Sequence, residues 1–158
     1  MRIAMIYEGT NHIQALDLVG RKLLIGGGRL IRNFQKEYKT LLASAGEDER
    51  LAEFVAPTKK ALDDLSQITM MLAMKGMKDP EMVAAVASEY LNVFGYAVFS
   101  FSWLWQCKYA IEKGDSYGAT KLKLARFYFQ NVFPEIDAHK QIVLNGKDAM
   151  MDFDESEF

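Results

Sequence analysis

Glycine residues divide this sequence into segments of similar length, and the apolar residues between them have helical spacing. Gly26, Gly27 and Gly28 form one cluster, and single glycines follow at positions 46, 76, 114 and 146. Glycine is favoured just after a helix C-terminus, because the left-handed backbone conformation there causes it no steric clash. No segment has the strict alternation of a β-strand. The pattern therefore predicts an all-α chain.

The segments predict one short helix followed by four long ones, at residues 11–25, 29–45, 47–75, 80–113 and 116–145. Short glycine connections favour antiparallel neighbours, so we expect an up-down antiparallel helical bundle. The apolar positions expected in its core are Phe34, Leu41, Leu65, Leu72, Val86, Phe94, Phe101, Leu104, Leu124 and Phe127.

Individual residues predict where some of these helices begin or bend. Asp79 has the properties of an N-cap, and Pro80 suits the first helical position that follows it. Asp115 or Ser116 is expected to begin the last long helix. A proline inside a helix removes one backbone hydrogen bond, so we expect a kink or a broken first turn at Pro57 and a kink at Pro134.

Residues 90–107 carry no charge, which allows two classes of helix. Eighteen such residues are close to the lower limit for a membrane span. Polar residues interrupt the run, and its aromatic residues are spread through the middle rather than concentrated at the ends. These features favour a central helix that its neighbours surround. A membrane segment and an oligomer interface remain as the alternatives.

The composition excludes several functional classes. Nineteen basic and 21 acidic residues give a net charge of −2, which is not the basic surface that a nucleic-acid-binding protein needs. Cys107 is the single cysteine, so the chain can form neither an internal disulfide nor a cysteine-based zinc site. Residues 1–10 do not resemble a signal peptide. These features together predict a reducing, cytoplasmic location without membrane association.

Most of the chain has few candidate catalytic residues. Glu135 and His139 are spaced to lie on one side of a helix, but one such pair is too little for a di-metal centre, and a solvated face is the better interpretation. No metal site is predicted. We interpret Gly26–Gly28 as a hinge, and Lys59 with Lys60 as part of a solvated face. The methionines at positions 70, 71, 74 and 77 are interpreted as core filling.

Residues 6–23 carry a longer motif, IYEGTNHIQALDLVGRKL. This run resembles the C-terminal signature of the acyl-CoA dehydrogenase family, in which I-Y-E-G-T-x-x-I-Q precedes an amphipathic helix. It is most similar to the larger bacterial members, including the methylthiopropionyl-CoA dehydrogenases, which carry an additional helical domain after the signature. The resemblance implies three parts: the end of the catalytic core at 1–25, the additional helical bundle at 26–148 and an acidic tail at 149–158.

The resemblance also implies roles for five residues. Glu8 matches the glutamate that removes the α-proton of the acyl thioester, and Gly9 matches a residue beside the substrate. Thr10, Asn11 and His12 match the segment that contacts FAD, at a helix N-terminus suited to phosphate oxygens. His12 stands where the family often has glutamine.

The implied activity is the FAD-dependent oxidation of an acyl-CoA to its 2,3-enoyl-CoA. The implied partners are the acyl-CoA, an electron-transfer acceptor and further copies of the protein. The domains that supply most of such a pocket are absent from this sequence, so we expect this chain alone to be inactive and not to retain FAD. The alternative hypothesis is a helical interaction or oligomerisation module without catalysis of its own.

Overall fold

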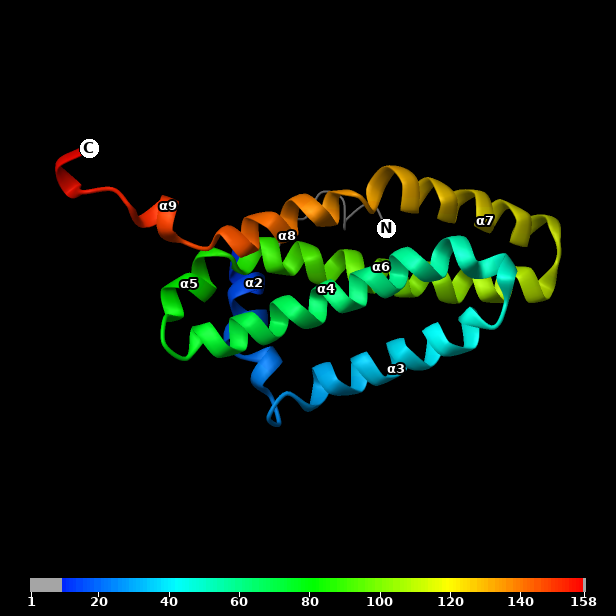
Figure 1. The fold of residues 1–158 in the computed structure, drawn as a ribbon, viewed down its shortest axis with the longest axis horizontal. Coiled ribbons are helices and arrows are strands. Elements are labelled where there is room, and N and C mark those ends of the chain that lie inside the picture. The colour runs from blue at the N-terminus through cyan, green and yellow to red at the C-terminus, as the bar shows by residue number, and fades with distance from the viewer. Residues whose placement is uncertain (1–9, 158) are drawn as a thin grey trace.

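The computed structural model describes residues 10–157, and all regular elements among them are helical (Figure 1). The α-helices are α2 (Asn11–Gly20), α3 (Arg29–Gly46), α4 (Ala52–Gly76), α5 (Pro80–Ala85), α6 (Ala87–Lys113), α7 (Ser116–Phe127), α8 (Glu135–Asn145) and α9 (Asp148–Met151). Three-residue helical turns occur at Lys22–Leu24, Glu49–Leu51 and Glu155–Glu157, and a wider π-helical turn spans Tyr128–Val132.

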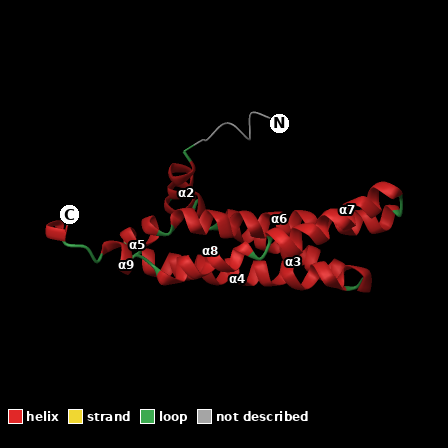
Figure 2. Cartoon of the chain, turned by 90° about the horizontal axis from the view of Figure 1, so that it is seen from above, coloured by secondary structure: helices red, strands yellow, loops and turns green. Residues whose placement is uncertain are grey.

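The helices form the predicted up-down bundle around α6. This helix packs against α4 and α3 on one side and against α7 and α8 on the other (Figures 1 and 2). The short helix α2 crosses the bundle and packs on the N-terminal half of α6 (Figure 2). The prediction of an all-α bundle is therefore confirmed.

Several predicted helix boundaries are also confirmed. The Asp79 carboxylate accepts a hydrogen bond from the Met82 backbone N–H at 3.1 Å, which is the geometry of an N-cap. Gly114 ends α6 with φ = 65°, in the left-handed region that glycine adopts without strain. Asp115 then begins α7, and its carboxylate accepts from the Gly118 N–H at 2.7 Å.

Three segments expected to be continuous helices are divided. The segment 11–25 is an α-helix only to Gly20, and a separate turn follows at Lys22–Leu24. The segment 80–113 breaks at Val86, which separates α5 from α6. The segment 116–145 widens into the π turn just before Pro134, where the Phe133 N–H bonds to the Tyr128 carbonyl at 2.8 Å. Proline cannot donate to the helix and its ring crowds the preceding turn, so a widened turn relieves that clash. By contrast, α4 runs through Pro57 after a separate first turn at Glu49–Leu51.

The core consists of two apolar clusters along α6. The larger joins α2, α4, α5, α6 and α8, and the smaller joins α3, α4, α6 and α7. Five predicted core residues are buried: Leu41, Leu65, Leu72, Val86 and Leu104. Three phenylalanines, Phe34, Phe94 and Phe101, are partly buried at the cluster edges.

Two predicted core residues are on the surface. Leu124 is 47% exposed and Phe127 is 60% exposed, because α7 packs on α6 through the smaller residues Gly118 and Ala125. Helical spacing shows that a helix has an apolar side, but α7 has apolar residues on more than one side. The prediction for Leu124 and Phe127 was therefore wrong.

The uncharged run forms the middle of α6, as expected for a central helix. Residues on its inner side, including Tyr90, Val93 and Ala97, are fully buried. On its outer side, Phe99 and Trp105 stay more than half exposed, so neighbours cover α6 incompletely. Among residues 10–157, no helix combines the length and apolar character that crossing a membrane requires.

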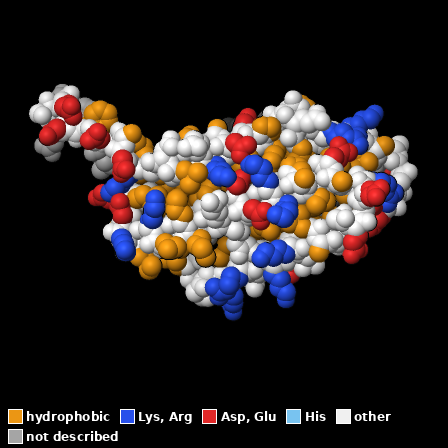
Figure 3. All heavy atoms as spheres, viewed as in Figure 1, with side chains coloured by type: hydrophobic (Ala, Val, Ile, Leu, Met, Phe, Trp, Pro, Cys, Tyr) orange, Lys and Arg blue, Asp and Glu red, His pale blue; other side chains and the backbone are white. Residues whose placement is uncertain are grey.

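The methionine cluster lies at the surface rather than in the core. Met70, Met74 and Met77 are each more than 60% exposed, whereas Met71 packs against the larger core cluster. Figure 3 shows hydrophobic side chains gathered at the end of the molecule where α4 ends. The interpretation as core filling was wrong for three of the four residues, because α4 at this end presents one side to solvent.

Candidate functional site

The residues that the signature motif singles out lie at the start of α2. Glu8 and Gly9 fall outside the described residues. Thr10 precedes the helix with φ = 58°, and its carbonyl accepts the first helical hydrogen bond, from the Gln14 N–H at 3.1 Å. Thr10, Asn11 and His12 are all exposed. The predicted helix start at Asn11 is confirmed, and it directly follows the IYEGT residues.

His12 connects this site to the bundle. Its Nδ1 atom shares a hydrogen bond of 2.5 Å with the Ser88 hydroxyl in the first turn of α6. On the same side of α2, Ala15 and Val19 are buried in the larger core cluster. The start of α2 is thus held by both a polar and an apolar contact with α6.

The end of α2 is stabilised by local ion pairs. The Asp17 carboxylate pairs with Arg21 at 2.6 Å and with Lys22 at 3.1 Å. Arg21, and after it Lys22, lower the pKa of Asp17 to about 2. These contacts fix the C-terminal turn of α2 without involving the bundle.

The outer side of α2 is apolar, and none of the described residues covers it. Ile13 is 60% exposed and Leu16 is 41% exposed, although both lie in a helix whose opposite side is buried. A ten-residue helix with apolar residues on both sides is typical of an element packed between two layers. The described residues supply only one of those layers.

The Glu135 and His139 pair is bound to α6. The Tyr96 hydroxyl donates to Glu135, and its ring stacks on His139 with the ring centres 5.7 Å apart. Partial burial and the Glu135 carboxylate raise the pKa of Tyr96 to about 12. His139 Nδ1 also contacts the Glu89 carboxylate. Within the described part of the chain, no three His, Cys, Asp or Glu side chains lie close enough together to hold a metal ion.

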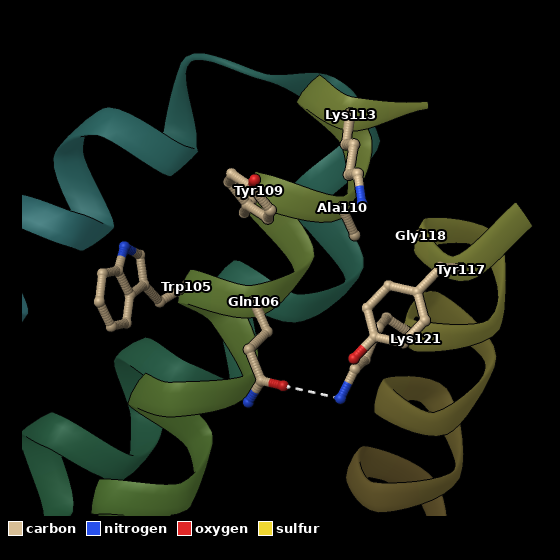
Figure 4. Close-up of a pocket in the computed structure, with 8 residues that line it drawn as sticks. All are labelled: Trp105, Gln106, Tyr109, Ala110, Lys113, Tyr117, Gly118 and Lys121. Atoms are coloured by element: carbon tan, nitrogen blue, oxygen red, sulfur yellow. Dashed lines mark hydrogen bonds between the residues drawn. The ribbon is translucent and has the colours of Figure 1, made fainter. Parts of the chain in front are cut away.

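A pocket that sequence reasoning missed lies between α6 and α7 (Figure 4). It has a volume of about 340 Å³ and is bordered by three exposed aromatic rings, those of Trp105, Tyr109 and Tyr117. The ammonium groups of Lys113 and Lys121 lie 5.6 and 5.5 Å from the centre of the Tyr117 ring. The ammonium group of Lys121 also donates to the Gln106 side chain at 3.2 Å (Figure 4).

Comparison with known proteins identifies the family. A family model described as acetyl-CoA dehydrogenase C-terminal like matches residues 31–154, which include α4 to α9 and nearly all of α3. The chain belongs to this family. The acetyl-CoA dehydrogenase C-terminal-like region therefore coincides with the helical bundle that follows α2.

Two curated proteins are similar to this member of the family. A 3-methylmercaptopropionyl-CoA dehydrogenase of Ruegeria pomeroyi is 38% identical over 105 residues, covering 60% of this chain and 16% of that protein. A butyryl-CoA dehydrogenase of Syntrophomonas wolfei is 28% identical over 144 residues, covering 85% of this chain and 23% of that protein. The chain therefore spans less than a quarter of the length of these relatives.

Proposed function

We propose that this chain is the C-terminal part of an FAD-dependent acyl-CoA dehydrogenase, which oxidises an acyl-CoA thioester to the 2,3-enoyl-CoA. The observation that carries the proposal is the IYEGT motif directly before α2, joined to a bundle of the acetyl-CoA dehydrogenase C-terminal-like family. The names of the two relatives, both acyl-CoA dehydrogenases, support it. An electron-transfer acceptor and further copies of the protein are the partners that such an enzyme requires.

In this proposal Glu8 is the catalytic base. The α-proton of a thioester is weakly acidic, so the base must be a carboxylate whose pKa rises when substrate excludes water from it. The Glu8 carboxylate takes the proton from the α-carbon while the β-carbon loses a hydride. Gly9, which has no side chain, lets the acyl chain approach the backbone next to that carboxylate.

Thr10, Asn11 and His12 form the part of the FAD site that this chain contributes. A hydroxyl, an amide and an imidazole at the positive end of α2 are hydrogen-bonding groups that suit a flavin and its phosphate oxygens, so these residues fit the cofactor. When bound, FAD accepts the hydride from the β-carbon. Because His12 Nδ1 shares its hydrogen bond with Ser88, Nε2 is the imidazole nitrogen that would form a hydrogen bond with the cofactor.

The first test is the Glu8→Gln variant of the complete parent enzyme. Glutamine keeps the shape of glutamate but has no basic oxygen, so kcat is expected to fall by at least about 10²-fold. FAD content and acyl-CoA binding are expected to stay unchanged, because neither needs the charge. The measurement is single-turnover bleaching of the flavin by a saturated acyl-CoA. Near-normal bleaching would show that the base lies elsewhere in the parent enzyme.

The second test concerns the chain on its own. Because α2 contributes only one edge of the FAD site, added FAD is expected to leave the melting temperature of the 158-residue chain unchanged. A ligand that binds the folded state must raise that temperature. Purified chain is likewise expected to be colourless and to lack dehydrogenase activity. A yellow protein or a clear thermal shift with FAD would contradict this part of the proposal.

A second candidate function is an interaction module without catalysis of its own. The exposed aromatic side of α6 and the exposed methionines of α4 are the observations that favour it. The two functions are separable, because the Glu8 experiment tests catalysis alone and the oligomeric state of the chain tests association alone.

A further inference from the structure

The pocket between α6 and α7 combines aromatic and cationic groups. Trp105, Tyr109 and Tyr117 are each more than 60% exposed around it, although aromatic rings of this size are usually buried. Lys113 and Lys121 supply its charges, and none of the described residues that line it is acidic. The Lys113 ammonium group also pairs with the Asp115 carboxylate at 2.9 Å, whereas Lys121 makes its polar contact with the neutral Gln106 side chain. Such a site suits a ligand that offers an aromatic ring and carboxylates together, because the ring packs among the rings and the carboxylates pair with the ammonium groups.

The chain itself contains a segment of this chemistry. Residues 152–157 read Asp-Phe-Asp-Glu-Ser-Glu, which places one aromatic ring among four acidic side chains. Phe153 is 60% exposed. We propose that this acidic segment of one copy docks in the α6–α7 pocket of a second copy.

The segment is too far from the pocket of its own chain. Lys147, just before α9, pairs with Asp79 and Glu81 at 2.9 Å each. These ion pairs hold the chain that leads into the acidic segment at the start of α5. From the first turn of α6 to Tyr109 the helix rises about 30 Å. The six residues from Lys147 to Asp152 extend at most about 20 Å. Figure 1 shows the acidic segment and the α6–α7 turn at opposite ends of the molecule.

Because the acidic segment and the pocket lie at opposite ends of the molecule, two copies can form a dimer in which both segments are docked. If two copies lie side by side in antiparallel orientation, each acidic segment meets the pocket of the other copy. Both contacts are then identical under a two-fold axis, which is the commonest symmetry of protein dimers. None of the residues involved belongs to the IYEGT motif or to α2, so this inference is independent of the catalytic proposal.

The experiment measures the oligomeric state of the 158-residue chain by sedimentation at low salt. The unmodified chain is expected to dimerise. The variants K113E/K121E and D152K/D154K each place like charges together, and each is expected to raise the dimer dissociation constant by at least about tenfold. The matched control K39E/K123E reverses two exposed lysines outside the pocket and is expected to leave that constant unchanged.

The combined variant K113E/K121E/D152K/D154K separates a direct contact from a folding defect. It restores opposite charges at both positions, so dimerisation is expected to return, while melting temperatures confirm that every variant folds. A blocked peptide of residues 150–158 is expected to dissociate the dimer of the unmodified chain. A monomeric unmodified chain, an undisturbed dimer in either double variant, or a combined variant that stays monomeric would overturn the proposal.

Discussion

Tyr38 places a hydroxyl group inside the bundle where α3, α4 and α6 meet. The hydroxyl lies 3.1 Å from the Thr58 and Ala97 carbonyl oxygens and 2.7 Å from the Ser100 hydroxyl. Burial raises the pKa of Tyr38 well above its ordinary value, so the group stays protonated and keeps its hydrogen bonds. A buried polar group with several partners fixes the position of three helices at once.

Replacing Tyr38 by phenylalanine should therefore destabilise the fold. Tyr38→Phe leaves the buried Ser100 hydroxyl and two carbonyls with one partner fewer, and the free energy of unfolding is expected to fall by about 1–3 kcal/mol. Urea unfolding followed by circular dichroism measures it. The control Tyr109→Phe changes a ring that is 64% exposed and is expected to stay within about 0.5 kcal/mol. Equal effects of both changes would refute a structural role for the Tyr38 hydroxyl.

The contact between α6 and α7 depends on a glycine. A Cβ atom placed on Gly118 would lie 2.5 Å from the Ala110 carbonyl oxygen, which is too close for two non-bonded atoms. The Cβ position is fixed by the α7 backbone and the oxygen belongs to the α6 backbone, so a larger residue could be accommodated only if the helices separate. Gly118 therefore sets how closely α7 approaches α6.

Two glycine-to-alanine changes test this interpretation. Gly118→Ala is expected to destabilise the chain by about 1–3 kcal/mol, because the added methyl group forces the helices apart. Gly95→Ala is the matched control, since a Cβ there meets nothing within 4 Å, and it is expected to stabilise α6 by about 0.5–1 kcal/mol. Thermal unfolding measures both. The interpretation fails if the two variants shift the melting temperature in the same direction.

Local residue chemistry predicted the fold best at the helix ends. Asp79, Gly114 and Asp115 have the roles that their residue types indicated, because capping depends on neighbours within four residues. The break at Val86 and the π turn at Tyr128–Val132 were not foreseen, since they depend on packing between distant helices. The surface positions of Leu124 and Phe127 were missed for the same reason, because the spacing of apolar residues along a helix does not show which side another helix will cover.

The same distinction applies to the candidate site: the part that depends on local sequence was predicted, and the part that depends on packing between helices was not. The motif at residues 6–23 predicted the start of α2 correctly, whereas the roles of Glu8 and Gly9 stay predictions. The α6–α7 pocket was missed because two helices contribute to it. A signal existed in the spacing of Trp105, Tyr109 and Lys113 by four residues, which places them on one side of a helix away from the buried stripe.

At the scale of the whole molecule, charged groups join α4 to α8. The Asp64 carboxylate, whose side chain is 9% exposed, pairs with Lys140 of α8 and with Lys60 of its own helix. Lys60 also pairs with Asp137 of α8. Burial alone would raise the pKa of Asp64, but Lys140 and Lys60 outweigh it and hold this pKa below its usual value.

This lowered pKa predicts how stability depends on pH. The folded state binds a proton at Asp64 less readily than the unfolded state, so the stabilisation is fully present above about pH 4 and is lost as pH falls through the lowered pKa. Asp64→Asn is expected to lower the free energy of unfolding by about 1–3 kcal/mol at pH 7. The difference from the unmodified chain should shrink below pH 4.

Unfolding in urea between pH 2 and pH 7 provides the measurement. The control Asp63→Asn removes an exposed carboxylate that pairs with Lys59 on the surface, and it is expected to change stability by less than about 0.5 kcal/mol at pH 7. If the difference between Asp64→Asn and the unmodified chain keeps its size at pH 2, the ion pairs of Asp64 are not its source.

The position of α2 has a mechanical consequence. Ala15 and Val19 bury one side of this ten-residue helix in the bundle, and the hydrogen bond between His12 and Ser88 ties its first turn to α6. A ten-residue helix is only about 15 Å long, so with these contacts we expect α2 to move with α6 as one body. A tilt of α6 is therefore expected to move the Thr10 backbone, two residues after Glu8 in the sequence, together with α2.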